Sequence, residues 1–335
     1  MNGRARQAKW TLLIGAGVGL AVAAAIVVVL RTNTTGEQGS APDEGFVYDL
    51  KPLAKTDPKL VLYEETGTIT TGFKEPRAVA VDGEGRVYVA GDKAVSVFRG
   101  HDADVADFRR IALGASPHCL AIANGGTLYI GMNQHVEVYD AKGERKAVWE
   151  SLGDDAVLTS IAVAGGDVFV ADAGNRVVVR YDTSGKVLGR IGRKDESRNI
   201  SGLLVPSPYL DVAIGREGLL WVANPGRFRL EAYTAGGDLE IWWGKSSSSQ
   251  IEGFCGCCNP SNFAILPDGK FVTAEEGLPR VKIYKADGTF EGVVAGTESF
   301  AEGTVGLDVA ADSHGCILVL DPPRRIVHIY TRIGK

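Results

Sequence analysis

The chain has 335 residues, with 36 Lys and Arg against 41 Asp and Glu, which gives a formal net charge of −5. Nucleic-acid-binding proteins normally carry a clear basic excess, so this balance argues against a nucleic-acid partner. Hydrophobic residues make up 45% of the chain, which excludes a disordered polyanion. Five cysteines are too few for a small protein held together by disulfides. The 43 glycines indicate a globular chain with many tight turns.

The first feature along the chain is an uncharged apolar run from Trp10 to Leu30. At ~1.5 Å per helical residue, it matches the ~30 Å hydrocarbon core of a bilayer. Three basic residues precede it within 1–9, so the positive-inside rule places 1–9 in the cytoplasm. A cleaved signal peptide is the alternative, although LRTN at 30–33 lacks the small residues of a cleavage site. We therefore predict an uncleaved signal-anchor helix over 10–30, with the remainder extracytoplasmic, either periplasmic or at the cell surface.

A polar stretch containing Gly, Ser and Pro follows over 31–58 and is typical of a flexible linker. Over 59–335 the chain repeats one unit six times, each with a short apolar strand, a Gly/Asp turn, a second strand, a loop and a third strand. Six positions align in the first strands, spaced by 41, 41, 51, 51 and 46 residues: Ala78, Cys119, Ser160, Asp211, Asn262 and Asp308. Units of this size match the four-stranded blades of a propeller. The prediction is an all-β, six-bladed β-propeller behind one transmembrane helix.

The last unit ends near Gly334 without a fourth strand. We predict that Lys59–Tyr63 (KLVLY), which precedes the first unit, supplies the missing outer strand. Such closure would join the two ends of the ring and remove an exposed sheet edge.

One repeat carries a family resemblance. The segment FVADAGNRVVVRYDTSGKVLGRIG at 169–192 resembles an NHL repeat, and the other five units resemble degenerate versions of it. The resemblance implies a six-bladed β-propeller. NHL-type propellers include protein-binding scaffolds, RNA binders and lyases, and they resemble lactonase-type metal enzymes. Because one fold hosts many activities, the resemblance implies no single function.

The strongest local anomaly is FCGCCNP at 254–260, where Cys255, Cys257 and Cys258 fall within four residues. Thiolates at this spacing can bind a soft metal or an iron–sulfur cluster, or form a redox-active disulfide. A purely structural disulfide is the alternative, because thiols outside the cytoplasm tend to oxidise. Cys119 is a candidate disulfide partner or further ligand. His118 beside it could be a second ligand or simply a hydrogen-bonded channel histidine.

A second candidate site consists of oxygen ligands. Asp211, Asn262 and Asp308 share one position on three consecutive units, and Glu275 follows the second strand of the fifth unit. Such oxygens around a propeller axis could hold Ca²⁺. Lactonase-like propellers use Glu, Asn and Asp in this way, which is what the resemblance to them implies. The alternative is that these side chains hydrogen-bond strand backbones within a blade.

The topology of a propeller places the long inter-unit loops and the cysteines on one face over units four to six. The prediction is a membrane-anchored binding or electron-transfer-associated module, with a cysteine site on this loop face and a protein or small-molecule partner there. The alternatives are a metal-dependent lactonase-like or lyase-like enzyme, and a disulfide-stapled interaction scaffold. No Ser-His-Asp triad, P-loop or dinucleotide motif is recognisable in the sequence, which favours binding over catalysis.

Overall fold

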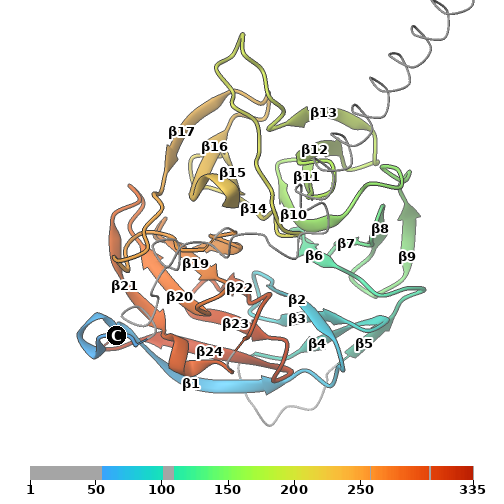
Figure 1. The fold of residues 1–335 in the computed structure, drawn as a ribbon. Helices are drawn as coiled ribbons and strands as arrows, with labels where there is room; N and C mark the ends of the chain where they lie inside the picture. The colour runs from blue at the N-terminus through green and yellow to red at the C-terminus, as the bar shows by residue number, and fades with distance from the viewer. Residues whose placement is uncertain (1–54, 101–108, 257, 302, 335) are drawn as a thin grey trace, which may run out of the picture. The chain divides into compact units, whose positions relative to one another are not determined.

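The computed structural model describes residues 55–100, 109–256, 258–301 and 303–334. Six antiparallel sheets of four strands each surround a common axis as blades (Figure 1). This arrangement confirms the predicted all-β, six-bladed propeller. The predicted anchor over 10–30 lies outside the described residues, and within them no helix is long and apolar enough to cross a membrane.

In the first three blades the strands follow the chain from the axis outward. Blade I comprises β2 (Pro76–Val81), β3 (Val87–Gly91), β4 (Ala94–Phe98) and β5 (Arg109–Ala112). Blade II comprises β6 (Cys119–Ile122), β7 (Leu128–Gly131), β8 (Val136–Tyr139) and β9 (Arg145–Val148). Blade III comprises β10 (Leu158–Ala164), β11 (Asp167–Asp172), β12 (Val177–Asp182) and β13 (Val187–Ile191).

The other three blades include the closing one. Blade IV comprises β14 (Val212–Ile214), β15 (Leu220–Asn224), β16 (Arg229–Tyr233) and β17 (Leu239–Trp243). Blade V comprises β18 (Asn262–Ile265), β19 (Phe271–Glu275), β20 (Arg280–Tyr284) and β21 (Phe290–Ala295). Blade VI comprises β22 (Asp308–Ala311), β23 (Ile317–Asp321), β24 (Ile326–Arg332) and β1 (Tyr63–Thr70). Three short 3₁₀ helices complete the described elements: η3 (Pro58–Leu60), η4 (Pro225–Arg227) and η5 (Thr297–Ser299).

The core lies between neighbouring blades rather than inside any one sheet. Second and third strands such as β3 and β4 are buried at every residue, because adjacent blades cover both of their faces. Ala171 and Val178 of blade III, for example, share a core cluster with Val212 and Leu220 of blade IV. Outer strands such as β9 and β13 are largely exposed. The loops at either end therefore rest on a rigid frame.

The ring is closed by β1, which pairs antiparallel with β24 from Tyr63 opposite Arg332 to Thr70 opposite Ile326. Figure 1 shows β1 and β24 side by side in this sheet. Closure by an N-terminal strand is confirmed, but the predicted residues are wrong. Pro58–Leu60 form a 3₁₀ helix, capped by the Asp57 side chain, which accepts from the backbone N–H of Lys59.

The error has a simple cause. The prediction chose the most apolar run, whereas the outer strand that closes the ring is buried at only two of its eight residues. In β1 the side chains of Tyr63 and Ile69 are buried, while Glu64 and Glu65 are exposed. Val61 forms a separate bridge to Val293 of β21 in the neighbouring blade.

A buried histidine ties the closing strand to the interior of blade VI. His328 Nδ1 lies 3.1 Å from Glu65 Oε1 on β1, and Nε2 lies 3.6 Å from Asp321 Oδ2 on β23. Burial alone lowers the pKa of His328, but the two carboxylates outweigh it and the pKa is raised. The imidazolium form therefore links β1 to the rest of its sheet.

Closure can be tested at Ile69, which is buried in the core between blades VI and I. We expect Ile69→Ala to lower the free energy of unfolding by about 2–5 kcal/mol, through lost burial and the cavity left behind. Glu64→Ala on the exposed side of the same strand should stay within about 0.5 kcal/mol of the parent. Urea unfolding measures both. Equal, small effects of the two substitutions would show that β1 does not close the ring.

Candidate functional site

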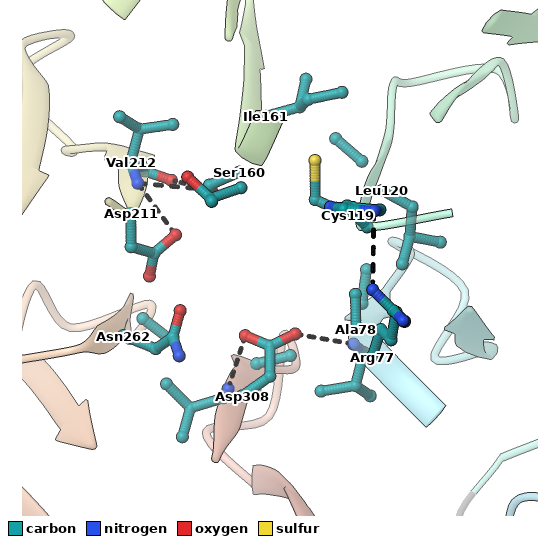
Figure 2. Close-up of a pocket in the computed structure, with 18 of the residues that line it drawn as sticks. Arg77, Ala78, Cys119, Leu120, Ser160, Ile161, Asp211, Val212, Asn262 and Asp308 are labelled. Atoms are coloured by element: carbon teal, nitrogen blue, oxygen red, sulfur yellow. Dashed lines mark hydrogen bonds between the residues drawn. The ribbon is translucent and has the colours of Figure 1, made fainter. Parts of the chain in front are cut away.

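The central channel is lined by the first strands of the blades and encloses about 590 Å³. The six residues aligned from the sequence all line it, and Figure 2 labels each of them. Five occupy equivalent registers against the second strand of their blade, as in the pairs Cys119–Gly131 and Asn262–Ala274. The sixth, Asp211, accepts a backbone hydrogen bond from Ala223 just before β14 begins.

Two carboxylates in this channel each join two blades. Asp211 Oδ2 accepts from the backbone N–H of Phe263 in the next blade at 2.7 Å. Asp308 Oδ2 accepts in the same way from Val79 of blade I, also at 2.7 Å. The other oxygen of each carboxyl accepts from the backbone of the following residue in its own blade. These side chains do hydrogen-bond strand backbones, but they link neighbouring blades as well as their own.

Polar side chains of two other blades extend this pattern around the axis. Asn262 Nδ2 donates to the carbonyl of Leu307 at 2.8 Å, linking blade V to blade VI. Thr159 Oγ1 donates to the carbonyl of Leu210 at 2.6 Å, linking blade III to blade IV. The polar side chains that blades III to VI direct into the channel thus have a structural role, because each one fixes a first strand against that of the next blade.

The two channel carboxyls titrate near neutrality. Burial raises the pKa of Asp211 to about 6. Burial, together with the negative charge of Asp211, raises the pKa of Asp308 to about 7. Perturbed groups in a cavity can serve chemistry as well as structure.

On the opposite side of the channel, His118 and Cys119 do not form a ligand pair. His118 Nε2 lies 3.5 Å from Arg77 Nη1, and its pKa is lowered by burial and by that cation. The Cys119 thiol is buried and its pKa is raised by burial. Its sulfur fills the space above Gly131, where an added Cβ would come within 2.3 Å of it. Cys119, a candidate disulfide partner for the cysteine cluster, forms no disulfide with Cys255 or Cys258 among the described residues.

Glu275 does not reach the channel either. It ends β19 inside blade V, fully buried, with Oε2 2.5 Å from Arg280 Nε and Oε1 paired with Lys282 Nζ. The last residue of a second strand lies beneath the loops of its own blade and away from the axis. The structure therefore brings together only Asp211, Asn262 and Asp308 of the predicted oxygen ligands.

The Cys loop, residues 251–260 between β17 and β18, is anchored by Lys282. Lys282 Nζ donates to the carbonyls of Ile251 at 2.8 Å and Gly253 at 2.7 Å. Its pKa is lowered to about 8 by burial, which the Glu275 carboxylate partly opposes. Phe254 is fully buried beside Tyr284, with ring centroids 5.7 Å apart. The first half of the Cys loop is thus part of the core between blades IV and V.

The side chain of Asn259 holds the second half of the Cys loop in place. Its Nδ2 donates to the carbonyls of Cys255 at 2.6 Å and Glu276 at 3.0 Å. Its Oδ1 accepts from the backbone N–H of Glu276 at 2.8 Å. A cis peptide bond joins Asn259 to Pro260. The Cys loop is therefore held against the turn that connects β19 to β20.

The two described thiols of the Cys loop have different surroundings. Cys255 is buried, and its Sγ accepts from Arg280 Nη2 at 3.5 Å. Burial and the Glu275 charge raise the pKa of Cys255, whereas Arg280 and Lys282 act in the opposite direction. Cys258 is half-buried, and the predicted site residue Cys257 lies outside the described residues.

Two polar neighbours of these thiols went unnoticed in the sequence. Glu276 follows the predicted Glu275 and is half-buried, and burial raises its pKa to about 7. Tyr209 at the channel mouth has its pKa raised by burial and then by the charges of Glu276 and Cys258. Arg280 and Lys282 were also missed as a pair, although two cations within the apolar third strand RVKIY are a detectable signal.

No cluster of three or more His, Cys, Asp or Glu side chains that could hold a metal ion occurs among the described residues. The geometry therefore does not supply the predicted soft-metal, iron–sulfur or Ca²⁺ site from the side chains it describes.

Comparisons with known proteins give the fold. The solved structures that resemble the chain include a streptogramin B lyase, with 10% identity, a TM-score of 0.55, and coverage of 81% of this chain and 97% of that one. The chain is a β-propeller. Virginiamycin B lyase from Staphylococcus aureus resembles it at 14% identity, TM-score 0.55, covering 81% and 99% of the two chains. The WD40 propeller domain of Doa1 does so at 14% identity, TM-score 0.56, covering 81% and 98%.

No family model and no curated protein matches the sequence. At these identities the solved structures establish the fold alone, and the resemblance to NHL repeats stays a prediction.

The channel carboxyls predict a pH-dependent stability. Because the folded-state pKa of Asp308 is about 7, above its unfolded value of about 3.8, the folded protein binds the extra proton between these pH values. The free energy of unfolding should therefore fall as pH rises from about 4 to about 7. Asp308→Asn should flatten this dependence, and urea unfolding at a series of pH values measures it. An unchanged slope in the variant would contradict the assignment.

The anchoring of the Cys loop predicts the effect of Lys282→Met. This change leaves the buried Glu275 without one partner and removes two donors to the Cys loop, so the free energy of unfolding should fall by about 3–5 kcal/mol. The matched control is Lys285→Met, at an exposed position just beyond the same strand. Amide hydrogen exchange should quicken in the Cys loop of the first variant only. Comparable stability of both variants would contradict the role of Lys282.

Proposed function

We propose that the chain is a membrane-anchored, extracytoplasmic propeller that works as a binding or electron-transfer-associated module, with the Cys loop as its working site. The partner is a protein or small molecule that docks on the loop face of blades IV to VI. The NHL-like architecture supplies a rigid platform for such loops.

The observation that carries this proposal is the way the Cys loop is held. Lys282 and Asn259 fix its backbone, while Arg280 contacts the sulfur of Cys255. Cys258 remains half-buried next to Asn259, and its charge acts on Tyr209. A loop that served only as a connection would not require a buried lysine and a buried arginine. The arrangement is that of thiols held in a defined place.

Charge favours redox chemistry over a metal cation at Cys255. Arg280 and Lys282 carry positive charge against the single carboxylate of Glu275, and all three side chains are buried. A further cation bound to Cys255 would add repulsion in a region of low dielectric. The same two cations oppose the rise in the pKa of Cys255 that burial and the Glu275 charge cause.

A second candidate function is a lyase-like or lactonase-like enzyme that uses the channel. The supporting observation is the pair Asp211 and Asp308, whose pKa values of about 6 and about 7 suit proton transfer near neutral pH. One observation argues against this enzyme function: every carboxyl oxygen of Asp211 and Asp308 already accepts a backbone hydrogen bond.

The test is a redox titration of the full-length chain in membranes. The protein is equilibrated in glutathione buffers of increasing oxidised fraction, alkylated, and its thiols counted by mass spectrometry. We expect reversible loss and recovery of thiols confined to the Cys loop, with Cys119 protected by burial. A membrane-impermeant maleimide should label Cys258 in cells whose plasma membrane is intact.

The matched control is Cys316→Ser, which removes a cysteine at the start of the second strand of blade VI and should titrate like the parent. A variant with Ser at positions 255, 257 and 258 should lose the reversible change and keep its fold by circular dichroism. Loop thiols that stay reduced throughout would overturn the proposed function.

A further inference from the structure

The Cys loop places a carboxyl beside one of its thiols. The Asn259 side chain forms two hydrogen bonds with the backbone of Glu276, one as donor and one as acceptor. Cys258 is the residue immediately before Asn259, so this clamp brings the backbone of Cys258 close to that of Glu276. The charges of both residues also act on Tyr209.

The carboxyl of Glu276 has no hydrogen-bond partner for its buried Oε1 among the described residues. A buried acceptor without a partner is costly unless it has a function or a ligand. Burial raises the pKa of Glu276 to about 7, so its carboxylate can accept a proton near neutral pH. The half-buried Tyr209 is the titratable group on which the Glu276 charge acts, and Glu275 precedes Glu276 in the chain.

The second thiol is positioned to complete a pair. Cys255 and Cys258 are separated by two residues, and the Asn259 side chain donates to the Cys255 carbonyl. Gly256 has a positive φ of 81°, a conformation that suits glycine. Arg280 Nη2 contacts Cys255 Sγ, and the buried Arg280 Nη1 has no partner among the described residues. This guanidinium would stabilise a thiolate at Cys255.

We propose that Cys258 and Cys255 form a dithiol pair that exchanges with the disulfide of a partner molecule, with Glu276 as the proton acceptor for Cys258. This inference rests on the proposed function and names its chemistry. Arg280 is the positioning residue for Cys255.

The reaction balances within the pair and its partner. The thiol proton of Cys258 passes to Glu276, and the thiolate attacks the partner's disulfide, forming a mixed disulfide and releasing one partner thiolate. The first partner thiolate takes the proton of Cys255, whose sulfur beside Arg280 then attacks Cys258 Sγ and releases the second partner thiolate, which takes the proton held by Glu276. The two protons from the cysteines end on the two partner thiols. The pair is oxidised to one disulfide, and the partner's disulfide is reduced to two thiols.

The experiment follows the oxidation of the full-length chain by glutathione disulfide, with products mapped by mass spectrometry. The parent should form a disulfide between Cys255 and Cys258. Cys255→Ser should stop at a glutathione adduct on Cys258, and Cys258→Ser should form neither product. Cys257→Ser should behave as the parent does.

The role of Glu276 is tested by the rate. In the parent the rate should rise with pH through about 7, where Glu276 becomes ionised. Glu276→Gln keeps the backbone clamp, and it should slow the reaction at neutral pH by about 100-fold and remove this rise. Glu252→Gln, in the same loop, is the matched control and should leave rate and profile unchanged. Arg280→Lys should slow the second step and let the glutathione adduct accumulate.

A Glu276→Gln variant with the parent's rate and pH profile would overturn the assignment of the base. A disulfide that always includes Cys257 would overturn the pair. Either result leaves the proposed function standing, provided that the loop thiols still titrate reversibly. Loop thiols that do not titrate at all would overturn both the dithiol pair and the proposed function.

Discussion

Closure of the ring by β1 and β24 is the constraint on which the rest of the molecule depends. A blade is stable only when neighbours cover both faces of its inner strands, so an open ring would leave two faces and a sheet edge uncovered. Once β1 pairs with β24, each first strand meets the next around the axis, as the contacts from β2 through β22 and back to β2 show. The channel and the positions of all the loops follow from that closed circle.

The closed ring also explains where charge can be buried. Three consecutive blades carry a charged or titratable residue at the same place in the third strand, opposite the middle of the second: Glu231, Lys282 and His328. Each has a partner at the end of the second strand of its own blade, namely Asn224, Glu275 and Asp321. In blades I to III the same place holds Ser96, Glu137 and Val179. Glu137 of blade II is also buried and accepts from Tyr139 Oη, as Glu231 accepts from Tyr233 in blade IV. Blades IV to VI differ in that the residue ending the second strand is itself the polar partner.

Each polar pair fixes a different segment. In blade VI, His328 reaches Glu65 on the closing strand. In blade IV, Asn224 accepts from the backbone of Leu204 in the long loop that precedes the blade. In blade V, Lys282 holds the carbonyls of the Cys loop. Buried ion pairs contribute little net stability but are costly to break. Their value here lies in specifying where a loop sits, which is what a site built from loop residues requires.

The sequence by itself determined the repeat, the six blades and the shared channel position, because strand alternation and turn residues are local signals. It also showed that the FCGCCNP segment has no counterpart in the other repeats. It misplaced the closing strand, since an outer strand lacks the continuous apolar run that marks an inner one. It also grouped Glu275 with the channel oxygens, whereas the pairing of β19 with β20 turns that carboxylate toward Arg280 and Lys282. Only the tertiary structure decided that the Asn259 side chain holds the backbone of Glu276 and that Arg280 contacts Cys255. The first of these contacts bridges two loops and joins residues that are 17 positions apart in the chain.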